Sequence, residues 1–383
     1  MRRDPLESDA PGSNLPQATQ LGLLDVEAIR LILSGQSVVD WAVVAFENIA
    51  DVDAFLGLLR IDTSDAGDQA RLRYVFNEAV SYAEENLPHL RLREHLGRPE
   101  DVREVFLWAG QVAKFRRRQM LACVTLKLMH VIHHMQAADL KSKLPVSEAE
   151  LMDRAETAIL RDARTLRDGG LGVRSFYGSR KSRTSTIAKL VAKSDNIAAT
   201  IFDKLRFRVV VHEHDELVPV LAWMSRNLFP FPYVIPGESH NNLIPPGDLL
   251  SWVAKDQRKH AQVFADEDAL TTDRGKNEFS AASYRAVNFI VDYPMLVPVQ
   301  PDNADRLRYG RVVFVMVEFQ VMDAVTAATN EEGDNAHHLY KARQWRTVEE
   351  RLLRGSWQRK KRSEPSENKP SEPAENKSSE PSE

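Results

Sequence analysis

The strongest constraint on the fold is a change of hydrophobic period near residue 195 of this 383-residue chain. Before that point, apolar residues recur at intervals of three and four, as along one face of a helix. Beyond it, three stretches rich in Val, Phe and Ile have the composition of strands, at residues 202–211, 283–291 and 311–321. The pattern predicts an α/β or α+β protein with its helices in front.

Helix boundaries in the first half are marked by punctuating residues. Residues 66–87 are expected to form a helix that ends before Pro88. A longer helical stretch is expected at 102–138. Ser147 and Glu150 have the spacing of a capping box for a further helix. The predicted organisation is a flexible leader at 1–20, a helical domain at 21–145, a sheet-containing domain at 146–350 and a disordered tail at 360–383.

Composition excludes several classes of protein. A single cysteine, Cys123, excludes a disulfide framework and a multi-cysteine metal site. No run of 18 apolar residues or secretory signal is visible, so we expect a cytoplasmic protein without a membrane partner. Residues 363–383 carry six Glu and two Lys, which accounts for the whole net charge of −4. This tail has too few apolar side chains to fold, and the remaining chain has no overall basic character that would attract nucleic acid.

Residues 179–189 (SRKSRTSTIAK) contain a basic pattern. If they are helical, Lys181, Ser185 and Lys189 recur every four residues and share one face. Two ammonium groups around a hydroxyl, with Arg180 beside them, suit a polyphosphate. A solvated basic helix start has the same pattern and is the commoner origin of it.

Polar residues also interrupt the predicted strands. Asp203 begins the first one, where a carboxylate could hold a divalent cation or simply face water. In the last one, Glu318 and Gln320 follow an apolar run, and a carboxylate there is costly unless it is paired, binds metal or lies at a cleft. Tyr284 and Asn288 share a face of the middle strand, where they could stack on and orient a nucleobase. Taken singly, each of these could be an ordinary sheet residue.

The order of these segments resembles the synthetase domain of RelA/SpoT-type alarmone synthetases. That family has a Lys-x-x-x-Ser-x-x-x-Lys segment, an Asp-x-x-x-x-Arg strand, a Tyr-x-x-x-His strand and a Glu-x-Gln strand. The corresponding residues here begin at Lys181, Asp203, Tyr284 and Glu318. A later helix matches the family at Gly333, Ala336-His337 and Tyr340-Lys341. The likeness spans residues 150 to 345, with less than half of them in matched motifs.

The resemblance implies an α+β fold, with a nucleotidyltransferase-like mixed sheet behind an all-α N-terminal domain. It implies a pyrophosphokinase that transfers the β,γ-pyrophosphate of ATP to the 3′-hydroxyl of GDP or GTP with Mg²⁺. By position, Lys181, Ser185, Lys189 and Arg180 would hold ATP phosphates. Asp203 and Glu318 would bind Mg²⁺, and Glu318 could instead take the hydroxyl proton. Tyr284 would stack on the acceptor base, with Asn288 and Gln320 beside it.

Two departures from the family pattern keep other functions open. Ser179 stands where the family has arginine, and Asn288 replaces a histidine that could carry positive charge near the acceptor. One alternative is pyrophosphate transfer to a tRNA 3′ end, attracted by basic groups such as Arg116, Arg117 and Arg118. Another is a degenerate domain that binds nucleotide or a partner without turnover.

Overall fold

The computed structural model describes residues 21–36, 46–110, 116–168, 170–192, 204–252, 283–297, 302–332 and 341–353. The predicted leader at 1–20 and tail at 360–383 lie outside these ranges and stay predictions, as does Asp203 with its surroundings. Within the described residues, no helix combines the length and the apolarity needed to cross a bilayer.

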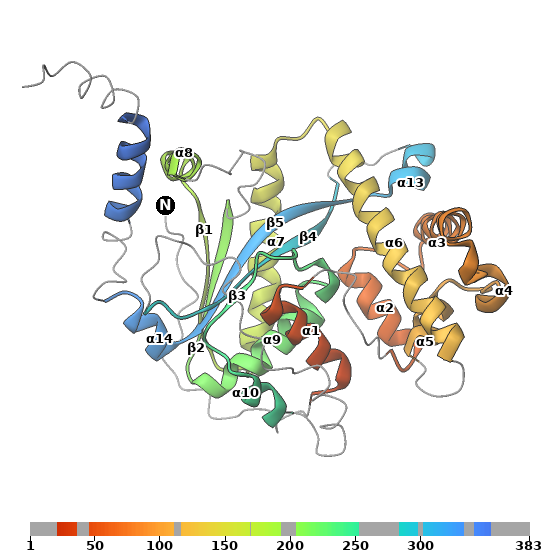
Figure 1. Ribbon diagram of the computed structural model, residues 1–383, viewed down its shortest axis with the longest axis horizontal. Coiled ribbons are helices and arrows are strands. Elements are labelled where there is room, and N and C mark those ends of the chain that lie inside the picture. The colour runs from red at the N-terminus through yellow and green to blue at the C-terminus, as the bar shows by residue number, and fades with distance from the viewer. Residues whose placement is uncertain are drawn as a thin grey trace, which may run out of the picture.

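Helices form the first part of the chain (Figure 1). They are α1 (Leu23–Ser34), α2 (Ile49–Leu58), α3 (Ala66–Asn86), η1 (Pro88–Leu90), α4 (Leu92–Leu96), α5 (Arg103–Gly110), α6 (Arg116–Lys143) and α7 (Glu148–Asp168). The expected helix at 66–87 is confirmed as α3. The stretch at 102–138 is helical on either side of residues 111–115, which are not described. The Ser147 cap is also confirmed, because its hydroxyl accepts a hydrogen bond from the Glu150 backbone amide at 3.2 Å.

The second part alternates strands and helices. Its elements are β1 (Val173–Arg180), α8 (Arg183–Ala192), β2 (Leu205–Val211), η3 (His214–Glu216), α9 (Leu217–Asn227), η4 (Phe231–Tyr233), β3 (His240–Asn241), α10 (Pro246–Ser251), β4 (Val287–Leu296), α13 (Asn303–Tyr309), β5 (Val312–Asp323) and α14 (Ala324–Thr329). Residues 341–353 form a further helix. The three predicted strands are confirmed as β2, β4 and β5, but β4 begins at Val287 rather than at residue 283. Tyr284 therefore precedes the strand, and the expectation that it shares a strand face with Asn288 is wrong. The strand β1 and the two-residue β3 were not expected.

The strands form one mixed sheet in the order β1-β2-β5-β4-β3. The β2–β5 pair is parallel and the other three pairs are antiparallel. The prediction of a mixed sheet within an α+β protein is therefore correct. In Figure 1, α8 and helix 341–353 lie beyond β1 on one side, and α3 to α6 lie beyond β4 and β5 on the other.

One face of the sheet is apolar and packs against helices. Its central side chains are Phe207, Phe289 and Phe319, all fully buried, and Phe229 at the end of α9 packs against the last two. The same buried cluster continues into α1 to α7. Because the helical segment and the sheet share this core, independent folding of residues 21–145 stays a prediction.

Candidate active site

The other face of the sheet carries polar side chains across its three central strands. Side chains alternate along a strand, so every second residue of β2, β4 and β5 faces this side. The register aligns Arg206 of β2 with Glu318 of β5, and Arg208 with Gln320. Asn288 of β4 then lies opposite Gln320. Five polar residues therefore form two rows on one face, which we call the polar face.

The buried carboxylate of Glu318 is the centre of the polar face. Its Oε2 accepts a hydrogen bond from Arg206 Nε at 2.6 Å, and its Oε1 accepts one from Gln320 Nε2 at 3.2 Å. The Glu318 side chain is only 4% exposed, whereas that of Arg206 is 36% exposed. A charge-assisted hydrogen bond of this kind stabilises the ionised carboxylate, and the partly exposed guanidinium is able to turn toward an arriving anion.

Two buried oxygens on the polar face have no hydrogen-bond partner among the described residues. They are Oε1 of Gln320 and Oδ1 of Asn288, which lie on neighbouring strands in register. Buried polar atoms are nearly always paired, so two unpaired acceptors together call for an explanation. They can accept hydrogen bonds from a ligand that lies across the strands.

Tyr284 lies at the edge of the polar face, just before β4. Burial raises its pKa; nearby Arg208 and Arg206 act to lower it, and Glu318 acts to raise it. The tyrosine packs against a small cluster of Val210, Ala286 and Met322. Its ring therefore has an apolar support and lies within electrostatic range of the two arginines.

The predicted phosphate-binding segment splits between a connection and a helix. Lys181 precedes α8, and its backbone amide donates to the carbonyl of Lys204. The expectation that Lys181, Ser185 and Lys189 share one helical face is therefore wrong for Lys181. The hydrogen-bonded end of β1 extends through Arg180, which delays the start of the helix to Arg183. Ser185 and Lys189 do lie four residues apart on α8.

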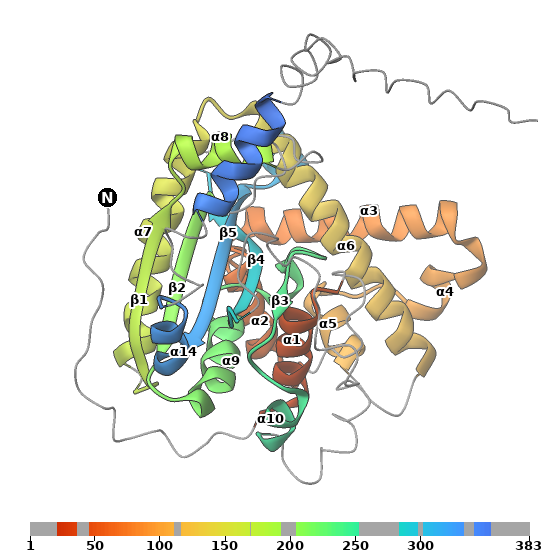
Figure 2. The ribbon, with the colours of Figure 1, turned by 60° about the vertical axis from the view of Figure 1, so that its left-hand side comes forward.

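Helix 341–353 brings a further cation to α8. Lys341 Nζ donates a hydrogen bond to the Ser185 hydroxyl at 3.1 Å and one to Gln344 at 3.2 Å. Val348 of the same helix packs against Ala188 and Ala192, and Figure 2 shows the two helices side by side. Lys341 was matched by spacing with the family, but its contact with Ser185 joins residues 156 positions apart and no local signal predicts it.

Arg180 lies on the opposite side of the sheet from Glu318. It pairs with Leu205, a residue of the apolar face, and its guanidinium forms ion pairs with Glu156 and Asp153 of α7 at 2.7 and 2.6 Å. These contacts anchor β1 to α7. The expected role of Arg180 in holding phosphate stays a prediction, without support from its position here.

The oxygen ligands on the polar face suit a magnesium ion that is bound together with substrate phosphates. No group of three or more His, Cys, Asp or Glu side chains among the described residues could form a metal cage. Mg²⁺, however, is commonly held by one or two carboxylates together with substrate phosphates. Glu318 offers one carboxylate, and the unpaired oxygen of Gln320 lies beside it. Asp203, the second predicted ligand, is not described.

Comparisons with known proteins gave only distant matches. No family model and no curated protein matches the chain. Among solved structures, small alarmone synthetase 1 from Bacillus subtilis is 14% identical, over 61% of this chain and 93% of that chain, with a TM-score of 0.29. The same enzyme bound to its product pppGpp is 17% identical, over 61% and 94%, with a TM-score of 0.28. A GTP pyrophosphokinase family protein from Streptococcus pneumoniae is 11% identical, over 56% and 89%, with a TM-score of 0.27. Such scores are too low to establish a shared fold, and we argue function from this chain's own residues.

Proposed function

We propose that the protein is a nucleotide pyrophosphokinase that transfers the β,γ-pyrophosphate of ATP to the 3′-hydroxyl of GDP or GTP. The observation that carries the proposal is the buried Glu318 carboxylate, held by Arg206 and Gln320 in a strand whose six preceding residues are all apolar. A sheet gains little stability from such a pair, because desolvation offsets the attraction between its charges. The order of motifs from Lys181 to Lys341 supports the same reaction.

Glu318 accepts the proton in this proposal. The acceptor 3′-oxygen attacks the β-phosphorus of ATP, and the new O–P bond forms as the bond from that phosphorus to the α,β-bridging oxygen breaks. AMP leaves, and the hydroxyl proton passes to Glu318. For this step Arg206 must exchange its contact with Glu318 for one with a phosphate, which its 36% exposed side chain permits. General-base action of this kind contributes about 10²- to 10⁴-fold to the rate.

Cations at two places would hold the donor phosphates. Lys341 reaches Ser185 on α8, Lys189 lies on the same helix as Ser185, and Lys181 precedes that helix. Mg²⁺, when bound by the phosphates with Asp203 as the expected protein ligand, would neutralise charge on the transferred group and leave Glu318 to act as the base. Phosphoryl-type transfer depends mainly on such positioning and charge neutralisation.

We assign the base of the acceptor nucleotide to the second row of the polar face, which contains Gln320 and Asn288 and lies next to Glu318. Tyr284 has the apolar support that a stacking platform needs. The unpaired oxygens of Asn288 and Gln320 can accept hydrogen bonds from amino or imino groups of a base. We infer a guanine nucleotide as the acceptor, because guanine presents adjacent N–H donors along one edge.

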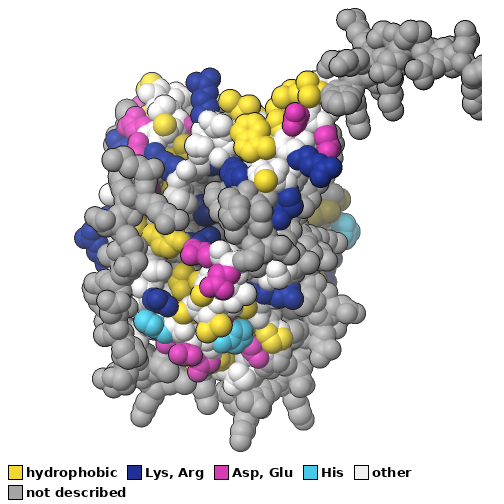
Figure 3. All heavy atoms as spheres, turned by 90° about the vertical axis from the view of Figure 1, so that its left-hand side faces the viewer, with side chains coloured by type: hydrophobic (Ala, Val, Ile, Leu, Met, Phe, Trp, Pro, Cys, Tyr) yellow, Lys and Arg dark blue, Asp and Glu magenta, His cyan; other side chains and the backbone are white. Residues whose placement is uncertain are grey.

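Transfer to a tRNA 3′ end is the second candidate, and it has less support. Figure 3 shows the side of the molecule that bears α8 and helix 341–353, and the described residues on it have Lys and Arg interspersed with Asp and Glu rather than forming a continuous basic surface. In the basic segment expected to attract RNA, the Arg118 guanidinium lies 3.6 Å from the centroid of the Trp108 ring and is engaged there. A domain that binds nucleotide or a partner without turnover is the third candidate function.

The cytoplasmic location expected from the sequence stays a prediction.

Radiolabelled ATP with Mg²⁺ and either GDP or GTP tests the proposal. The protein should form a slower-migrating labelled nucleotide, and Glu318→Gln should lower the rate at least ~100-fold. Glu350→Gln is the matched control, because Glu350 is a solvent-exposed partner of Arg346 on helix 341–353. Equal loss in both variants would contradict the role of Glu318. Product with tRNA alone would establish the second candidate, and ATP binding without labelled product would establish the third.

A further inference from the structure

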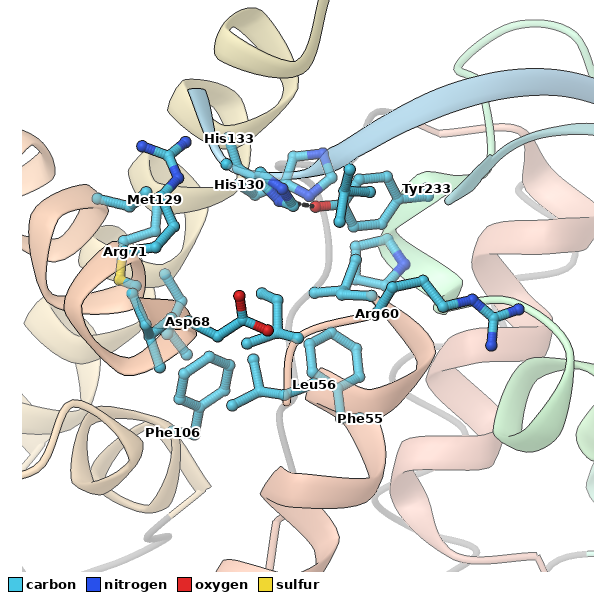
Figure 4. Close-up of a pocket in the computed structure, with 18 of the residues that line it drawn as sticks. Phe55, Leu56, Arg60, Asp68, Arg71, Phe106, Met129, His130, His133 and Tyr233 are labelled. Atoms are coloured by element: carbon cyan, nitrogen blue, oxygen red, sulfur yellow. Dashed lines mark hydrogen bonds between the residues drawn. The ribbon is translucent and has the colours of Figure 1, made fainter. Parts of the chain in front are cut away.

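A separate pocket lies between the helical segment and the start of β5. Its walls come from α2, α3, α5, α6, η4 and residues 310–312, and its volume is about 90 Å³. By the same kind of measure a single water needs roughly 10–15 Å³, so the space exceeds what packing normally leaves open. Figure 4 shows side chains from these distant segments converging on it.

Aromatic and aliphatic side chains form most of the pocket wall. Phe46, Phe55 and Phe106 contact one another with ring centroids 5.3 to 6.1 Å apart, and Phe231 lies 6.1 Å from Phe55. Aliphatic side chains such as Val75 complete the wall. An unfilled apolar volume forfeits dispersion contacts, so an occupant that packs against these rings would stabilise the protein.

Few polar groups face the space, and the most central one is an acceptor. Figure 4 shows the Asp68 carboxylate directed toward the middle of the pocket. Its Oδ2 accepts hydrogen bonds from Arg311 and from the Asp62 backbone amide, whereas its Oδ1 accepts one, from Arg306, among the described residues. A carboxylate oxygen accommodates two donors, so Oδ1 can accept one more.

The histidines on the opposite wall are neutral. Burial lowers the pKa of His130 and of His133 to about 3, so neither carries charge at pH 7. His133 Nδ1 and the Tyr233 hydroxyl are 3.0 Å apart, and the Tyr233 ring lies against His130. His130 and His134 have a spacing that can chelate metal, but they do not belong to any group of three or more His, Cys, Asp or Glu side chains among the described residues that could hold a metal ion. A neutral imidazole wall favours a neutral occupant.

Three arginines line the pocket, Arg60, Arg71 and Arg311, and none of them changes this preference. Arg60 donates to the Tyr293 hydroxyl, and Arg311 donates to Asp68 itself. The Arg71 guanidinium turns away from the centre of the pocket (Figure 4) and donates to the carbonyls of Leu307 and Arg308 at the end of α13. Its Nε has no partner among the described residues, which is a feature that would favour an anion. The central Asp68 carboxylate would repel that anion.

We propose that this pocket binds a small neutral aromatic molecule that carries one ring N–H or O–H donor. The ring would pack against Phe55 and Phe106, and its donor would reach Oδ1 of Asp68. The site is distinct from the polar face, and the proposal does not depend on the function inferred there.

Indole is a suitable probe, because it is flat, neutral and has one N–H donor. Isothermal titration should give a dissociation constant of about 0.1 to 1 mM, and saturating indole should raise the midpoint of thermal unfolding. Toluene tests the donor and should bind at least about fivefold more weakly. Indole-3-acetate tests the charge and should also bind more weakly. Tighter binding of this anion than of indole would overturn the proposed ligand class.

A matched pair of substitutions locates the site. Val75→Phe places a ring inside the pocket and should weaken indole binding at least about tenfold. Val131→Phe makes the same change on the exposed side of α6, where the side chain is 38% exposed, and should leave binding unchanged. If Val75→Phe does not fold, contacts between indole protons and the Phe55 and Phe106 rings, detected by NMR in the unmodified protein, decide the matter. Indole binding without those contacts, or no binding at 5 mM indole (about five times the weakest expected dissociation constant), would overturn the proposal.

Discussion

Two successive residues of β5, Glu318 and Phe319, are buried on opposite faces of the same sheet. Phe319 stacks on Phe207 at 5.7 Å and on Phe289 at 5.5 Å, so it joins three strands by packing alone. Glu318 joins β5 to β2 through the ion pair with Arg206. Burial alone therefore does not reveal what a residue contributes. On the apolar face it drives folding, and on the polar face it carries a desolvation cost that a ligand can offset.

The largest expected effect tests the apolar face. Phe319→Ala removes a ring from a fully buried stack and should lower the free energy of unfolding by about 3 to 5 kcal/mol. Glu318→Gln keeps the size of the side chain and its hydrogen bond from Arg206, and should change stability by at most about 1 kcal/mol. Urea unfolding of both variants measures the contrast. Equal destabilisation would show that the polar face is as important for folding as the apolar one.

The face of β5 that carries Glu318 is polar near Glu318 but is covered by α6 toward the beginning of the strand. We expect this difference to appear in how the free energy of unfolding depends on pH. There α6 covers Phe314, which contacts the rings of His133 and His134. Burial lowers the pKa of His130 and His133 to about 3, below the value of about 6.5 in an unfolded chain. The unfolded state binds more protons between these values, so stability falls as the pH decreases from about 6.5 toward 3.

The expected slope is up to about 1.4 kcal/mol per pH unit for each of these two histidines. Urea unfolding at intervals between pH 7 and 5 measures it, and His133→Asn should reduce it, since an amide does not titrate. A free energy of unfolding that is constant over this interval would mean that the two histidines bind protons equally in the folded and unfolded states, so that burial does not lower their pKa. The beginning of β5, covered by α6, would then tolerate charged side chains as the polar face does at Glu318 and Arg206.

The sequence predicts the parts of this fold that depend on local pattern. The Val- and Phe-rich alternation identifies β2, β4 and β5, because those strands are long and apolar on one face. It misses β1, whose sequence VRSFYGSR has few apolar residues, and β3, which has two residues. For a two-residue strand no periodicity exists.

The sequence predicts which residue types form the candidate site, but it does not predict which of them contact one another. Glu318, Gln320 and Asn288 were singled out because polar groups are rare on such strands. Side-chain alternation along the strand puts Arg206 on the face opposite Phe207, but its contact with Glu318, 112 residues away, depends on the register of β2 against β5. Register of that kind is set by the packing of the whole core, which local patterns do not encode.

The smallest expected effect concerns the end of β5, where the pKa of His214 shifts in the opposite direction to those of His130 and His133 on α6. Burial acts to lower the pKa of His214, but hydrogen bonds to Asp248 and Asp323 outweigh it and raise the pKa above 6.5. The stabilisation from this charge is therefore fully present below pH 6.5 and is lost as the pH rises through the raised value. The side chain is 47% exposed, and solvent screening limits the effect to about 0.5 kcal/mol. His214→Gln should cost this amount at pH 6 and nothing at pH 9, measured by urea unfolding. A larger cost at pH 9 than at pH 6 would mean that neutral His214 is the stabilising form, as for His130 and His133.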